Sequence, residues 1–208
     1  MVRVDERLEI FATILLALAT VGTAWSGYQA SRWNGEQAKA ASRANAARIE
    51  STRAAGRANA ETQVDVATFV AWVDAYALER TELADFYYAR FRREFRPAVE
   101  AWVATRPRRN PDAPLTPFAM PEYTLASQTQ ADELEATAEL WATRARDNIQ
   151  RATNYVLAVV LFAAVLFFAG MSTKLGTLRL RRVLLVVGAL LFVGTVVWVA
   201  SSPVSVSV

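Results

Sequence analysis

Three carboxylates have a spacing that could bind a divalent cation. Glu79, Glu82 and Asp85 recur at every third position, which places them near one another if this stretch is helical. Carboxylate oxygens are the ligands that hard divalent cations prefer. Di-metal sites in helical bundles, however, combine glutamate with histidine, and the chain contains no histidine. We therefore expect ordinary surface charge here, with no metal site and no cofactor.

The densest basic patch of the chain could grip an anionic polymer or lipid headgroups. Its members are Arg90, Arg92, Arg93, Arg96, Arg106, Arg108 and Arg109. Acidic residues lie among them, namely Glu94, Glu100 and Asp112. Because the net charge is only +3 and both signs are interspersed, we expect a solvated face of paired charges. No nucleic-acid interface is expected.

Several catalytic classes are excluded by residue type. Without cysteine or histidine, the chain offers no thiol nucleophile, no Cys/His zinc site, no histidine-ligated haem and no Ser–His pair. Phosphate-binding glycine loops, Gly-x-Ser-x-Gly elbows and zinc-protease motifs are also missing from the sequence. We expect no catalytic residues, and an enzyme that acts alone is the least favoured function.

Three apolar segments reach the length that a membrane span requires, about 17–25 residues. They are Leu8–Tyr28, Asn154–Met171 and Val183–Ala200, and none has a charge near its middle. Ion and proton transporters normally place charged residues there, so we expect anchors and packing surfaces instead. Small residues should allow close contact between these helices, namely Ala12, Ala19, Gly22, Gly188 and Gly194.

Charge predicts the orientation of the spans. The loop 172–182 carries four basic residues and no acid, so the positive-inside rule places it in the cytoplasm. The N-terminus then lies inside as well, and residues 29–153 lie outside. Aromatic residues agree, because they fall at the outer ends of the spans: Trp25, Tyr28, Tyr155 and Trp198. Trp25 and Tyr28 also replace the small residues of a cleavage site, so we expect an uncleaved anchor.

Beyond the first span, residues 37–96 contain no proline and a single glycine, Gly56. The membrane helix should therefore continue outward, either unbroken to Arg96 or with a hinge at Gly56. Small residues recur along it with heptad spacing at positions 40, 44, 47, 51, 54 and 58. A second seam follows the returning segment at positions 131, 134, 138, 141, 145, 148 and 152. Together the seams predict an antiparallel, coiled-coil-like hairpin.

Opposite charges predict the register of this hairpin. If both helices leave the membrane at the same height, residues whose numbers sum to about 180 should face each other. The expected pairs are Glu36 with Arg144, Lys39 with Glu139, Arg43 with Glu135 or Ala136, and Arg48 with Asp132. A parallel homodimer through the same seam would instead oppose Arg43 and Arg48. The pairing within one chain is therefore favoured.

Aromatic residues crowd positions 66–95, where a lone helix could not bury them: Phe69, Trp72, Tyr76, Phe86, Tyr87, Tyr88, Phe91 and Phe95. Pro97 should begin a short helix through Trp102. Residues 106–123 then hold five of the seven prolines together with Leu115, Phe118, Met120 and Tyr123. We expect this segment to lie over the aromatic residues as a stiff strap, the alternative being an exposed binding loop. The candidate partner-binding residues are Trp72, Tyr76, Phe118, Met120 and Tyr123.

Two further segments leave alternatives open. The sequence Trp33-Asn34-Gly35 could distort the helix and expose Trp33 to lipid headgroups, although a simple interfacial anchor is favoured. The tail 201–208 alternates polar and apolar residues and could add as a strand to a partner's sheet. We expect it to be disordered.

Together these features predict an all-α membrane protein. Residues 1–28 form a tail and the first span, which continues into a long antiparallel helical hairpin ectodomain at 29–153. A two-span C-terminal hairpin follows, with spans at 154–171 and 183–200, the basic loop 172–182 between them, and the tail 201–208.

Three short motifs carry a resemblance: Trp25-Ser26-Gly27-Tyr28-Gln29-Ala30, Pro117-Phe118-Ala119-Met120-Pro121-Glu122-Tyr123, and Tyr155-Val156-Leu157 leading to Leu166-Phe167-Phe168-Ala169-Gly170. Through them the chain resembles a family of uncharacterised bacterial three-span inner-membrane proteins that carry a domain of unknown function. The resemblance covers most of the chain. It implies a bacterial origin and the layout of one span, a helical domain and a two-span hairpin, and it brings no activity and no site residues.

The function we expect is that of an integral membrane scaffold or protein-interaction protein with a helical extracytoplasmic domain. Its partners would be the lipid bilayer and either further copies of the chain, in a homo-oligomer, or another membrane protein. The alternatives are a ligand-sensing ectodomain and an accessory subunit of a transporter or envelope complex. A sensor would need a partner chain, because the cytoplasmic segments are short.

Overall fold

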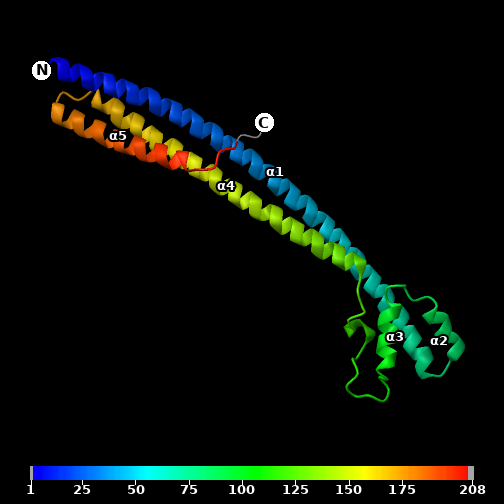
Figure 1. Ribbon diagram of the computed structural model, residues 1–208. Coiled ribbons are helices and arrows are strands. Elements are labelled where there is room, and N and C mark those ends of the chain that lie inside the picture. Colours follow the sequence, from blue (N-terminus) through cyan, green and yellow to red (C-terminus); the bar gives the residue numbers. More distant parts are fainter. Residues whose placement is uncertain (1, 206–208) are drawn as a thin grey trace. The chain divides into compact units, whose positions relative to one another are not determined.

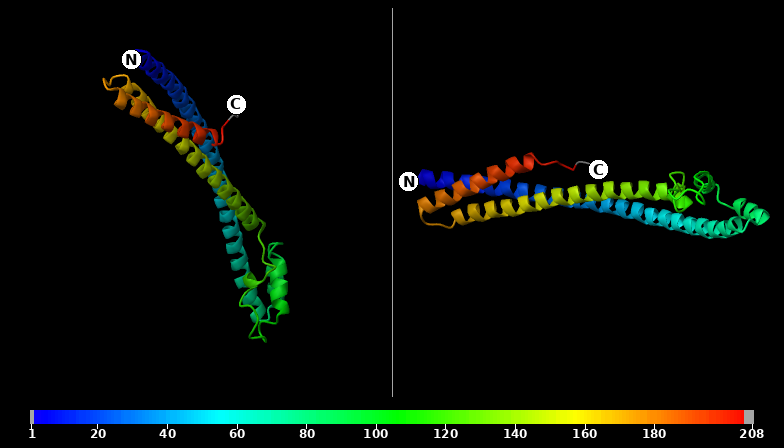
Figure 2. Two further views of the ribbon diagram at one scale, coloured as in Figure 1. Left: turned by 60° about the vertical axis from the view of Figure 1, so that its left-hand side comes forward. Right: turned by 90° about the horizontal axis from the view of Figure 1, so that it is seen from below.

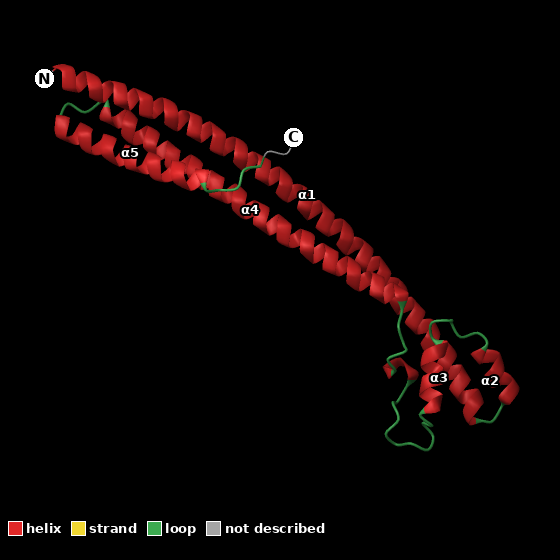
Figure 3. Cartoon of the chain, in the orientation of Figure 1, coloured by secondary structure: helices red, strands yellow, loops and turns green. Residues whose placement is uncertain are grey.

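The computed structural model describes the backbone of residues 2–205 and the side chains of residues 6–205. Within this range the chain is all-helical, with 81% helix and no strand (Figure 3). The elements are α1 (Val2–Ala77), α2 (Thr81–Tyr88), α3 (Arg96–Ala104), the short 3-10 helix η1 (Pro117–Ala119), α4 (Ala126–Ser172) and α5 (Leu178–Ala200). The expected all-α class and the short helix at Pro97 are confirmed. The chain divides into two compact units, Met1–Ser42 with Trp141–Val208, and Arg43–Leu140.

Helix α1 passes through Gly56 without a break, so the hinge considered there does not form. It also does not reach Arg96, because it ends at Ala77. The backbone N–H groups of Glu79 and Arg80 donate to the carbonyl oxygens of Tyr76 and Ala75, which closes the helix with a Schellman-type turn. Glu79 adopts a φ of 58° in this turn. It therefore lies outside α2 and does not share a helix with Glu82 and Asp85.

In the first unit, α1, α4 and α5 are each long and apolar enough to cross a membrane. The three expected spans fall within these helices, which lie side by side in this unit (Figures 1 and 2). Five residues of α1 and α4 form the buried part of this contact, Leu15, Ala19, Phe162, Val165 and Ala169, and side chains of α5 pack against it partly buried.

The glycines of these helices differ in how closely neighbouring side chains approach them. A Cβ atom on Gly22 would lie 2.7 Å from Cζ of Phe162, so this glycine makes room for the aromatic ring. A Cβ atom on Gly188 would lie 3.4 Å from Cβ of Phe168, which is also a close approach. Gly194 faces open space, since nothing would lie within 4 Å of its added Cβ. The contact expected at Gly194 is therefore wrong, whereas those at Gly22 and Gly188 are confirmed.

In the second unit, α1 and α4 contact each other through small residues. The hydroxyl of Ser51 donates to the carbonyl oxygen of Ala131 across 3.0 Å. Alanines of both seams are buried: Ala44, Ala54, Ala58, Ala131 and Ala138. These positions match the spacing that the sequence indicates.

Two of the charge pairs expected along α1 differ in the structure. Arg48 lies 2.9 Å from a carboxylate oxygen of Glu139 and 3.8 Å from one of Glu135, so its expected pairing with Asp132 is wrong. Lys39 pairs with Glu36 of its own helix at 2.8 Å instead of with Glu139. Exposed ion pairs contribute only about 0–1 kcal/mol, so small-residue packing decides the register and the long side chains adapt to it.

Candidate functional site

Residues 61–127 form a head with a core of aromatic side chains. The ring of Phe69 meets the rings of Phe95, Trp102 and Phe118 edge-on, with centroids 6.1, 5.4 and 5.8 Å away. Phe95 in turn stacks on Phe118 at 5.1 Å, with the two planes 8° apart. Edge-on and offset arrangements are those that aromatic rings prefer. The core thus draws on α1, on the segment after α2 and on the strap.

The strap covers this core as expected, with one exception. Phe118, Met120 and Tyr123 pack against the buried cluster, so the interpretation of 106–123 as a strap is confirmed for these residues. Leu115 is 93% exposed, and the expectation that it lies down on the core is wrong. The indole N–H of Trp102 donates to the carbonyl oxygen of Pro114, which holds this part of the strap by its backbone and leaves Leu115 outside.

The five candidate partner-binding residues are brought together in the head, but in different roles. Trp72 is buried in the core, with 6% of its surface exposed. Phe118, Met120 and Tyr123 are partly buried against the same cluster. Tyr76 stacks on Trp72 at 5.0 Å and is 43% exposed, so it presents the largest free surface of the five. Partner binding stays a prediction for the whole set, and Tyr76 is the member best placed for it.

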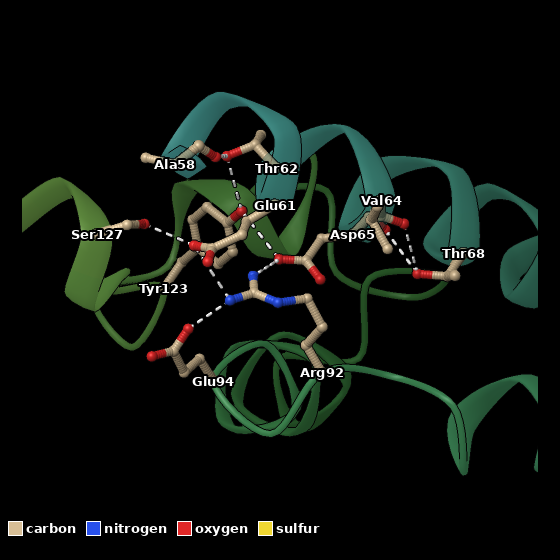
Figure 4. A network of polar contacts seen from close by, with 10 residues as sticks. All are labelled: Ala58, Glu61, Thr62, Val64, Asp65, Thr68, Arg92, Glu94, Tyr123 and Ser127. Carbon is tan, nitrogen blue, oxygen red and sulfur yellow. Dashed lines mark hydrogen bonds and ion pairs between the residues drawn. The ribbon is translucent and has the colours of Figure 1, made fainter. Parts of the chain in front are cut away.

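A polar network within the head joins α1 to the segment after α2 and centres on Arg92 (Figure 4). Its Nη1 donates to Oδ2 of Asp65 at 2.9 Å, and its Nη2 donates to Oε2 of Glu94 at 2.5 Å. The same Nη2 lies 3.2 Å from Oε2 of Glu61. Asp65 is fully buried, so this pair is removed from water on the carboxylate side. The Arg92–Glu94 contact agrees with the expected pairing of charges.

Hydroxyl groups extend the network to the strap and to α4 (Figure 4). The phenol oxygen of Tyr123 lies 3.2 Å from both Oγ1 of Thr62 and Oδ2 of Asp65. The hydroxyl of Ser127 donates to Oε2 of Glu61 at 2.6 Å. Four segments therefore meet at one point: α1, the segment after α2, the strap and the start of α4.

Burial and neighbouring charges shift the pKa values in this network. It raises the pKa of Asp65 above its usual value, although the charge and hydrogen bond of Arg92 act in the opposite direction. Burial likewise raises the pKa of Tyr123, with Asp65 adding to the effect. For Arg92, burial would lower the pKa, but the carboxylates of Asp65 and Glu61 outweigh it and the pKa rises. The arrangement stabilises a charged guanidinium.

Together with Thr62, Asp65 could have capped a new helix, but α1 is unbroken there, and the pairing of Asp65 with Arg92 was not predicted although a signal was present. Asp65 stands seven residues after Ala58 and seven before Trp72, and all three are buried on α1. A carboxylate at a heptad position of a buried seam predicts a buried partner of opposite charge.

The other charged groups that drew attention in the sequence do not form one site. Among the described residues, no cluster of acidic side chains could hold a metal ion. Arg90 lies 3.3 Å above the ring of Phe86, and Arg96 donates to the carbonyl oxygens of Ala89 and Phe91. Glu100 accepts a hydrogen bond from the hydroxyl of Tyr88, which raises the pKa of that tyrosine. The basic patch is thus divided among several local contacts.

The first unit contains a separate polar clamp on the C-terminal tail. The carbonyl oxygen of Pro203 accepts hydrogen bonds from Nε1 of Trp33 at 3.3 Å and from the hydroxyl of Tyr155 at 3.1 Å. The backbone N–H of Ser205 donates to Oε1 of Gln29 at 3.0 Å. Trp33 is only 8% exposed, so the alternative that the helix distorts and exposes it to headgroups is wrong.

Residues 203–205 of the tail thus bind to α1 and α4 through their backbone, which differs from the disordered tail expected. The rest of the tail, residues 206–208, lies outside the described range. Addition of the tail to a partner's sheet stays a prediction.

Three hollows meet on the head surface at Tyr76 and Arg108, and we call them together the Tyr76 groove. Their volumes are about 680, 520 and 340 Å³. Trp72 lines the first of them, but Phe118 lines none.

Comparison of the chain with protein-family models, with curated proteins and with solved structures found no match. The resemblance to three-span bacterial proteins therefore stays a prediction.

Proposed function

We propose that this chain is an integral membrane scaffold or protein-interaction protein whose head holds a partner protein. Residues 8–28, 154–171 and 183–200 would cross a bacterial inner membrane, with the N-terminus in the cytoplasm and residues 29–153 outside. In this proposal α1 and α4 leave the membrane together as an antiparallel hairpin that carries the head. The apolar length of three helices and the contacts between the two alanine seams support this arrangement.

One observation carries the proposal. The head has a closed aromatic core of its own, yet large apolar side chains remain exposed on its surface: Val66, Val70, Tyr76, Leu78, Leu83, Phe86 and Leu115. These side chains lie outside the buried cluster that forms the core. Apolar side chains that stay exposed together in one patch commonly mark a site of protein interaction, and in this proposal part of this set forms such a patch.

A ligand-sensing ectodomain is the second candidate, and the Tyr76 groove favours it. The stacked rings of Trp72 and Tyr76 line one of its hollows, beside Glu79, Arg80 and Asp85. The groove is open to solvent, however, whereas sites for small molecules usually enclose most of the ligand's surface. A protein partner therefore fits the head better than a small ligand does.

Site-specific photo-crosslinking in native membranes tests the proposal. The photoreactive amino acid benzoylphenylalanine would replace Tyr76 or Phe86, both of which are exposed on the head. Trp72 and Phe118 are unsuitable positions, because a probe there would disturb the aromatic core. Leu140, which is exposed on α4 outside the head, provides the control position.

The proposal predicts a covalent adduct with a protein chain, either another copy or a different membrane protein, from Tyr76 and Phe86 and not from Leu140. Adducts with lipid alone, or the absence of any adduct, would contradict the proposed scaffold function.

A further inference from the structure

Three arginines at the Tyr76 groove have side chains without a carboxylate partner among residues 6–205. Arg106, Arg108 and Arg109 are exposed and line the second hollow of the groove. Arg108 lies 5.9 Å from the centre of the Tyr76 ring, and none of the three forms an ion pair in the described part of the chain. Other arginines of the same unit, such as Arg48 and Arg92, each have carboxylate partners.

The charge of this hollow is unbalanced as a result. Glu79 is the one carboxylate among its lining residues, so three arginines and one glutamate leave a net charge of +2. Guanidinium groups bind carboxylates through paired N–H donors, which makes arginine well suited to acidic partners. The second hollow therefore favours a ligand that carries more than one carboxylate.

Backbone conformation at the same hollow points to a use for these side chains. Arg106 and Glu79 adopt φ values of 54° and 58°, and they are the non-glycine residues with positive φ among those described. Each follows the end of a helix, α3 or α1, where glycine is usually found because it adopts this conformation without strain. The chain thus places charged side chains at two positions where glycine would be more stable, and both border one hollow.

The third hollow adds an apolar wall beside the arginines. Val73, Trp102 and Leu115 line it together with three prolines, Pro107, Pro111 and Pro114. Leu115 is 93% exposed and belongs to a strap that is held through the carbonyl oxygen of the preceding residue. A rigid, apolar surface next to a basic one suits a ligand with an apolar side chain flanked by acids.

We infer that the Tyr76 groove binds an acidic segment of a different protein, with an apolar side chain on the Val73–Leu115 wall and carboxylates on Arg106, Arg108 and Arg109. This inference rests on the proposed scaffold function and names the chemistry of its partner. An extended or helical protein segment fits an open groove better than a small anion does. The segment is large enough to shield its own contacts with the groove from solvent. Electrostatic attraction of this kind also speeds encounter and excludes basic partners.

The test uses the full chain in native membranes with benzoylphenylalanine in place of Leu115. A variant with R106Q, R108Q and R109Q removes the three groove charges. A second variant with R53Q, R57Q and R93Q removes the same number of charges from exposed arginines elsewhere in the unit, which provides the control. Mass spectrometry of the crosslinked peptide identifies its sequence, and the thermal midpoint of each purified variant shows whether the head remains folded.

The inference predicts capture of a peptide from another protein with at least two acidic residues close to the crosslink. Capture should fall about tenfold in the groove variant and change less than about twofold in the control variant. Three results would overturn it: capture of lipid alone, capture of a second copy of this chain, or capture of another protein that does not depend on the three arginines. In the last two cases adducts from Phe86 would still support the scaffold function, whereas loss of all protein adducts would overturn both.

Discussion

Asp65 and Arg92 stand 27 residues apart in the sequence and form a charge-assisted hydrogen bond of 2.9 Å in the head. The carboxylate is fully buried, and the guanidinium also contacts Glu61 and Glu94. Because Tyr123 reaches the same carboxylate from the strap, this pair joins α1, the segment after α2 and the strap within the head.

Substitution R92A should destabilise the head. It would leave Asp65 buried without its charged partner, and breaking a buried pair from one side typically costs about 3 kcal/mol. The neighbouring Arg93 is exposed, so R93A should cost less than about 0.5 kcal/mol. Denaturant unfolding of the purified chain, followed by tryptophan fluorescence, measures both values. Equal effects of the two substitutions would contradict a central role for Arg92.

The pH dependence of the free energy of unfolding should show the raised pKa of Asp65. Burial raises its pKa above 3.8, so the carboxyl group of Asp65 binds its proton more tightly in the folded head than in the unfolded chain. The contribution of Asp65 to the free energy of unfolding is therefore fully present below that value and declines as the pH rises through the folded pKa. The variant D65N lacks this decline.

The stability of D65N relative to the natural chain should consequently improve between about pH 4 and about pH 7. Thermal midpoints measured across this range test it, with D74N at an exposed position of α1 as the control. A relative stability of D65N that worsens with rising pH would show that Arg92 outweighs burial.

Gly22 and Gly194 should respond differently to the same substitution. A methyl group on Gly22 would press on the buried ring of Phe162, and overpacking of this kind typically costs about 1–3 kcal/mol. G194A meets open space and should leave stability nearly unchanged. Thermal unfolding in detergent compares the two variants. A larger loss for G194A would mean that the packing of α1 against α4 has been misassigned.

The tail clamp predicts a change in accessibility. Tyr155 and Trp33 share one acceptor, the carbonyl oxygen of Pro203, so Y155F removes one of the two hydrogen bonds to this oxygen and leaves the one between Ser205 and Gln29. A cysteine placed at Ser205, in a chain that otherwise has none, should react faster with maleimide when Tyr155 is replaced. Y28F, at an exposed tyrosine, serves as the control. The same labelling rate in both variants would argue against the clamp.

Features that depend on length and spacing could be predicted from the sequence. The apolar segments and the alanine seams follow directly from periodicity, and Phe118 and Tyr123 could be assigned to the core because large apolar groups in a proline-rich segment need cover. The charge register could not be predicted, since Arg48 has several acids within reach and exposed pairs differ little in energy.

Other features left no sequence signal. Helix α1 ends at Ala77 through a turn that uses Glu79 in a conformation typical of glycine, and neither glycine nor proline marks the place. The clamp on Pro203 joins residues 170 positions apart through a backbone carbonyl, which any residue could supply. In the sequence, the three arginines of the groove could be recognised only as part of a larger basic patch. Which of these arginines form ion pairs among the described residues depends on the fold.

The proposed function requires a head that stands outside the membrane and can be reached there. Cysteine labelling in intact cells tests it directly, because the natural chain has no cysteine. A cysteine at the exposed position of Leu115 should react with a membrane-impermeant maleimide before lysis, whereas one at Gly176, in the loop between α4 and α5, should react only after lysis. The reverse pattern would invert the topology and contradict a head that receives partners outside the cytoplasm.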